Sequence, residues 1–110
     1  MSASACIAYF GLRWEIGPEE IDQLEQRRDP RQMSAGRAGL TSYWTNFGGA
    51  EERYVLLVGT KIAALGPEDH TSSSTLADQL ADVMRDTANK LESAELSGSP
   101  GLHIEWLEDS

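Results

Sequence analysis

Residues 53–58, RYVLLV, decide the fold class, because they contain four consecutive large apolar residues. An unbroken apolar run of this length is typical of a strand in the middle of a sheet, where both faces are covered. Gly48-Gly49 lie before it and predict a turn from LTSYWTNF, residues 40–47, which is β-prone throughout. The centre of the chain is therefore expected to form neighbouring strands.

The glycine that follows this run allows two interpretations. Gly59-Thr60 either turn the chain again into KIAALG, residues 61–66, or mark a bulge within one long strand. The first interpretation gives a meander of three strands, and the second gives two strands. The pattern of the sequence leaves both open.

Further strands are predicted near both ends of the chain. Residues 5–16 alternate, and Gly11 sits where the alternation changes phase, which predicts a bulge. Residues 102–106 alternate apolar side chains with a histidine and a glutamate. Trp14 and Trp106 lie on the apolar sides of these strands, so we expect both in the core.

Three helices are predicted between the strands. The first covers residues 17–28 and has glutamates in its first turn and arginines in its last. The second covers residues 30–38, with Asp29 as N-cap and Gln32 completing a capping box. The third is the best determined, because apolar residues recur at helical spacing through residues 76–91.

The order of these elements is strand, helix, helix, two or three strands, helix and strand. It predicts an α+β fold: a single-domain sandwich with an antiparallel or mixed sheet of four to five strands and helices packed on one face. A ferredoxin-like arrangement is the first candidate for the topology. With 110 residues, the chain is expected to form one globular domain over residues 1–110.

The charge of the chain limits the classes of partner. It carries 18 acidic and 9 basic residues, a formal net charge of -9, and most of the basic residues lie between residues 27 and 61. This balance argues against nucleic acid as a partner, because phosphate contacts need a basic surface. It suits a basic protein partner, or it serves solubility alone.

The sequence also predicts a compartment. The first apolar run, residues 5–12, is far too short to span a bilayer and no basic residue precedes it, so we expect neither export nor membrane binding. Cys6 is the only cysteine, so no internal disulfide can form. The cytoplasm is therefore the expected compartment.

No set of residues forms a recognisable catalytic, metal or cofactor motif. Cys6 lies in an apolar strand without a base nearby, which favours a buried structural thiol over a nucleophile. His70 and His103 are too few for a metal site of known spacing. No glycine-rich loop has the pattern that cradles phosphate. We therefore expect no catalytic residue, no metal and no cofactor, and the sequence favours a protein that is not an enzyme.

An arginine cluster is the first candidate binding feature. Arg27 and Arg28 close a helix with an acidic first turn, so the helix dipole accounts for them. Arg31 is different, because a cation in the first turn of a helix opposes the dipole. Arg31, together with Arg37, is therefore predicted to contact a ligand or partner.

Aromatic residues beside these arginines form the second candidate. Tyr43, Trp44 and Phe47 place aromatic rings on both faces of one predicted strand. At least one of those faces is expected to be exposed, and aromatic residues near arginine are typical of binding hot spots. Together, Arg31, Arg37 and these three aromatic residues are the predicted docking surface.

The third predicted helix carries an acidic stripe. Asp78, Asp82 and Asp86 recur every four residues and therefore share one face. Such a stripe is either an ordinary solvated face, which is the more common case, or a surface for a basic partner.

These features predict a non-enzymatic, acidic protein-binding module of the adaptor, inhibitor or immunity type. Homodimerisation through an edge strand or the aromatic segment is a companion prediction. The alternative is a small-ligand binding protein, or a minor hydrolase or isomerase, with a pocket between the helix at residues 30–38 and the sheet. In that pocket Arg31 or Arg37 would hold a carboxylate or phosphate, assisted by Tyr43 or His103.

Overall fold

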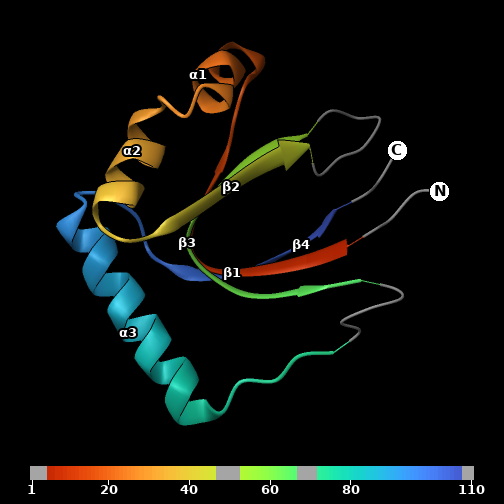
Figure 1. Ribbon diagram of the computed structural model, residues 1–110, viewed down its shortest axis with the longest axis vertical. Coiled ribbons are helices and arrows are strands. Elements are labelled where there is room, and N and C mark those ends of the chain that lie inside the picture. The colour runs from red at the N-terminus through yellow and green to blue at the C-terminus, as the bar shows by residue number, and fades with distance from the viewer. Residues whose placement is uncertain (1–4, 47–52, 67–71, 108–110) are drawn as a thin grey trace.

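The computed structural model describes residues 5–46, 53–66 and 72–107, and these residues form one sheet with helices beside it (Figure 1). The elements in chain order are β1 (Ala5–Glu15), η1 (Pro18–Glu20), α1 (Ile21–Glu25), α2 (Pro30–Arg37), β2 (Thr41–Asn46), β3 (Tyr54–Leu65), α3 (Ala77–Ser93) and β4 (Gly101–Leu107). The element η1 is a single turn of 3-10 helix that leads into α1.

The sheet has four strands in the order β2-β3-β1-β4, and every neighbouring pair is antiparallel. The predicted α+β fold is therefore confirmed, with the antiparallel form of its sheet. β3 runs without a break through Gly59, so the prediction of one long strand is correct, but the predicted bulge at Gly59 is wrong because the register is continuous there. The chain order β-α-β-β-α-β is the order of the ferredoxin-like motif, with its first helical segment divided into short pieces.

β3 is a central strand because its apolar run is covered on both sides. The side chains of Val55 to Val58 are fully buried. Leu56 and Val58 face a core cluster that also contains Leu24 of α1, Ala35 of α2 and Leu91 of α3. All three α-helices therefore pack on the same face of the sheet, as predicted.

The sheet bends sharply where Gly11 of β1 stands opposite Gly59 of β3 (Figure 1). A Cβ atom at Gly11 would overlap the carbonyl oxygen of Val58, so only glycine allows the two backbones to approach this closely. The predicted bulge at Gly11 is wrong. The register instead shifts between Ala8 and Tyr9, and the glycine pair keeps the ladder continuous through the bend.

The bend gives the sheet a convex face, which the helices cover, and a concave face. Four buried residues form a second cluster on the concave face: Ile7, Tyr9, Val55 and Leu57. Arg13 reaches Glu105 across this face, with 2.7 Å between Nε and Oε1. The concave face is thus lined by apolar side chains near the bend, and the ion pair between Arg13 and Glu105 spans it.

Helix ends differ from the prediction at two places. α1 ends at Glu25 instead of running to residue 28, because Arg27 takes a left-handed conformation with φ 56°. The N–H of Arg28 then donates to the carbonyl oxygen of Gln23 at 2.8 Å, which completes a Schellman motif. Gln32 does not complete a capping box; its side-chain amide donates to the carbonyl oxygen of Leu24 at 3.2 Å and so joins α2 to α1.

The prediction that Trp106 lies in the core is wrong, whereas Trp14 packs against the main cluster. Trp106 is 55% exposed because β4 is an edge strand and α3 packs mainly against β1 and β3. Among the described residues, no helix has both the length and the apolar character needed to cross a membrane.

Candidate functional site

Arg31 is held inside the protein by two carboxylates. Its Nε and Nη2 atoms donate to the two carboxylate oxygens of Asp29, each at 2.9 Å, and Nη2 also donates to Glu20 Oε1 at 2.6 Å. Its guanidinium carbon lies 5.2 Å from the centre of the Trp14 ring. The cation in the first turn of α2 is therefore neutralised by its own N-cap residue and by η1.

The ion pair shifts the pKa values of Asp29 and Arg31 in the directions that favour their charged forms. Hydrogen bonding by the Arg31 side chain lowers the pKa of Asp29 below its ordinary value of 3.8, although burial opposes the shift. Hydrogen bonding to Asp29 raises the pKa of Arg31. The ion pair with Asp29 therefore accounts for Arg31, whose charge opposes the helix dipole, without any ligand.

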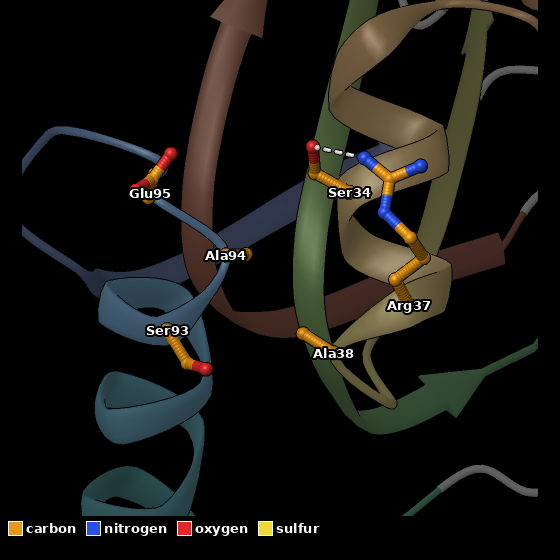
Figure 2. Close-up of a pocket in the computed structure, with 6 residues that line it drawn as sticks. All are labelled: Ser34, Arg37, Ala38, Ser93, Ala94 and Glu95. Carbon is orange, nitrogen blue, oxygen red and sulfur yellow. Dashed lines mark hydrogen bonds between the residues drawn. The ribbon is translucent and has the colours of Figure 1, made fainter.

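Arg37 lines an open cleft between the C-terminal ends of α2 and α3 (Figure 2). The cleft has a volume of about 250 Å³ and is lined by Ser34, Arg37, Ala38, Ser93, Ala94 and Glu95. The guanidinium turns back toward its own helix, where Nη2 donates to Ser34 Oγ at 3.4 Å (Figure 2).

The charges around this cleft do not favour an anion. Glu95 offers one negative charge against the positive charge of Arg37. The carbonyl ends of two helices meet there and add partial negative charge. The cleft therefore lacks the electrostatics needed to hold a carboxylate or phosphate.

The predicted aromatic residues are divided between the two faces of the sheet. Trp44 packs against the main core cluster, and its ring centre lies 6.4 Å from that of Tyr54. Tyr43 lies on the concave face beside the second cluster. Phe47 lies outside the described residues. The described members of the predicted docking surface, Arg31, Arg37, Tyr43 and Trp44, thus occupy separate environments.

The acidic stripe lies in solvent on α3. Asp78, Asp82 and Asp86 are all exposed. Arg85 donates to Asp82 Oδ1 at 2.8 Å and lies 3.9 Å from Asp86, which relieves part of the repulsion.

An exposed apolar surface lies on β4, and we call it the β4 stripe: Leu102, Ile104 and Trp106. Their exposed fractions are 56%, 62% and 55%. The alternation in residues 102–106 identifies this surface in the sequence, although the prediction for Trp106 is the core. Alternation identifies the apolar side of a strand and does not tell whether another element covers it.

A cavity of about 410 Å³ lies on the concave face, and we call it the concave cavity. Ala5 and Ile7 of β1 and Ala64 of β3 supply apolar walls. Tyr9, Thr41, Tyr43 and Lys61 supply polar atoms. Sequence reasoning gave Tyr43 alone of these residues a binding role, because the cavity forms only when three strands come together.

Within the described part of the chain, no three histidine, cysteine, aspartate or glutamate side chains lie close enough together to hold a metal ion. Comparisons of the chain with protein-family models, with curated proteins and with solved structures gave no match. The proposals below therefore rest on the geometry of this chain.

Proposed function

We propose that the protein is a non-enzymatic binding module that docks an extended segment of a partner protein along the outer edge of β4. The observation that carries this proposal is the β4 stripe, three large apolar side chains that are each more than half exposed on an edge strand. Fully burying an apolar side chain of this size stabilises an interface by roughly 1.5–3 kcal/mol.

The backbone of β4 supports the same mode of binding. β4 pairs with β1 on one side, and no described strand pairs with its other side. An edge of this kind offers unpaired N–H and C=O groups to an incoming strand. Backbone pairing would supply affinity, and contacts with the β4 stripe would supply specificity.

The partner is expected to be a basic protein with alternating apolar residues in its docking segment. The chain has a net charge of -9, and the aspartates on α3 are exposed, so its field attracts basic proteins and speeds their encounter. An adaptor or inhibitor in the cytoplasm fits these properties, since the fold carries no disulfide and Cys6 is a free thiol.

This proposal moves the docking surface away from the arginines named by the sequence. Arg31 is engaged by Asp29 and Glu20, and Arg37 turns toward Ser34. Neither arginine lies in an exposed apolar patch, whereas the β4 stripe is such a patch. The small-ligand alternative with an arginine-lined pocket gains no support from the cleft at Arg37, for the electrostatic reasons given above.

The test compares Ile104→Lys with Met33→Lys. Both changes place a lysine at an exposed apolar position, one on β4 and one on α2, where Met33 is 47% exposed. Partner proteins are captured from the native host, purified and titrated against each variant by calorimetry. We expect Ile104→Lys to weaken binding by about tenfold or more and Met33→Lys to leave it unchanged.

Two results would contradict the proposal. Equal affinity of the two variants for the purified partner would remove β4 from the interface. The second result is that no partner is captured, while light scattering shows a dimer of the parent protein that Ile104→Lys abolishes. In that case the occupant of the β4 edge would be a second copy of the chain and not a basic partner.

A further inference from the structure

The concave cavity lies on the opposite face of the sheet from the helices and has the size of a small-molecule site. Its volume of about 410 Å³ falls within the usual range for ligand pockets, roughly 300–1,000 Å³. It forms between the two arms of the bent sheet, with β2 on one side and the N-terminal half of β1 on the other. None of its lining residues belongs to the β4 stripe.

The walls of the cavity favour an apolar body. Ala5, Ile7 and Ala64 line it with aliphatic carbon, and the rings of Tyr9 and Tyr43 extend this surface. Ala5 and Ala64 have small side chains, so they leave this space open. A ligand with an aromatic ring or a branched alkyl group would remove this surface from water.

Lys61 gives the cavity one positive charge. It stands opposite Tyr9 in the ladder between β1 and β3 and is exposed. No carboxylate among the described residues forms an ion pair with it, in contrast to Arg13, Arg31 and Arg85. In a chain with twice as many acids as bases, an unpaired lysine beside an apolar cavity favours a ligand that brings one negative charge.

A phenol on the floor of the cavity is fixed by a hydrogen bond within the sheet. Tyr9 is only 4% exposed, so its hydroxyl lies largely out of solvent. Thr41 has one hydroxyl hydrogen, which it donates to the carbonyl oxygen of Gly59 at 3.0 Å. Thr41 Oγ1 then accepts from the Tyr9 hydroxyl, which lies 3.3 Å away. The hydrogen of Tyr9 is thus used within the protein, and Lys61 is left as the group that can meet a charged ligand.

From these features we propose that the concave cavity binds a small monocarboxylate with an aromatic or branched apolar body. Lys61 pairs with the carboxylate, and the aliphatic wall of Ile7 and the ring of Tyr43 pack against the apolar body. One lysine balances a single negative charge, so a phosphate dianion fits less well. This binding is separate from docking at β4 and stands or falls independently of it.

The experiment is an NMR titration of the ¹⁵N-labelled full chain with 1-naphthoate, and with 1-naphthalenemethanol as the uncharged counterpart. We expect the amide shifts to concentrate on Ile7, Tyr9, Tyr43 and Lys61. Lys61→Gln should weaken naphthoate binding by about tenfold and leave the alcohol unaffected. Lys90→Gln, which removes the same charge from α3, should leave both affinities unchanged.

A second variant keeps the test decisive if the lysine change perturbs the fold. Ala64→Phe adds a ring at an exposed position that lines the cavity, so it should abolish the binding of both probes. The proposal is overturned if millimolar naphthoate shifts no cavity amide. It is also overturned if Lys61→Gln and Lys90→Gln weaken binding equally, because that result means nonspecific attraction.

Discussion

Arg13 and Glu105 form an ion pair across the concave face, with 2.7 Å between Nε and Oε1, although the ladder places Glu105 opposite Ile7. A flat sheet would hold these two side chains far apart, since each residue advances a strand by about 3.3 Å. The contact exists because β1 bends at Gly11. Glu105 is 12% exposed and Arg13 is 24% exposed, so the pair is partly shielded from solvent.

We expect Glu105→Gln to reduce the free energy of unfolding by about 1–3 kcal/mol, because it weakens a shielded, charge-assisted hydrogen bond. The matched control is Asp82→Asn, which makes the same carboxylate-to-amide change in the exposed pair with Arg85 and should change stability by less than about 1 kcal/mol. Urea denaturation followed by tryptophan fluorescence measures both. Equal losses in the two variants would mean that the bend does not shield the Arg13 pair.

The change from glycine to alanine should have opposite effects on stability at Gly11, which lies in the bend, and at Gly36, which lies on α2. Gly11→Ala should destabilise the protein by about 1–3 kcal/mol or more, because the new methyl group meets the backbone of β3. Gly36→Ala on α2 meets nothing within 4 Å and should stabilise the helix by about 0.5–1 kcal/mol. Thermal unfolding of both variants tests the contrast, and a Gly11→Ala protein as stable as the parent would contradict the close approach of the strands.

The lowered pKa of Asp29 predicts a loss of stability in acid. Because the folded-state pKa lies below the ordinary 3.8, the stabilisation is complete above that value and is lost as pH falls through the folded-state pKa. Asp29→Asn keeps an N-cap side chain but removes the charge. The difference in unfolding free energy between parent and variant should therefore be largest near neutral pH and shrink in acid. A difference that stays constant from neutral pH to strong acid would assign the effect to the cap alone.

Arg31 and Arg37 should behave differently when each is replaced by methionine. Arg31→Met leaves the buried carboxylate of Asp29 without its main partner and should cost about 1–3 kcal/mol. Arg37→Met removes one long hydrogen bond at the surface and should change stability by less than about 0.5 kcal/mol. Chemical denaturation distinguishes the two, and similar small effects would reopen a binding role for Arg31. Neither change should alter partner affinity at β4.

The sequence predicted the elements whose evidence is local. The run Val55 to Val58 identified a strand covered on both faces, and the periodicity after Leu76 identified α3. The Asp29 cap was also predicted correctly, because Asp29 and Pro30 are neighbours and their chemistry needs no distant partner.

Errors arose where distant segments meet. Trp106 has a clear place in the strand pattern, but its exposure depends on where α3 lies. The partner of Arg31 in η1, Glu20, is eleven positions away, and no local pattern links the two residues, whereas Asp29 is close enough in sequence to suggest an ion pair. Lys61 carries no sequence signal at all, and its significance comes from the strands that enclose the concave cavity.

The position of β1 has a consequence for the order in which the sheet is completed. β1 leaves the ribosome before β3 and β4, yet it pairs with both of them. Until β4 emerges, one side of β1 lacks the partner that it has in the described sheet, so the nascent chain carries an open strand while the chain between the two strands is made. Contacts so distant along the chain also slow folding, and β1 is therefore exposed to mispairing or chaperone capture during translation.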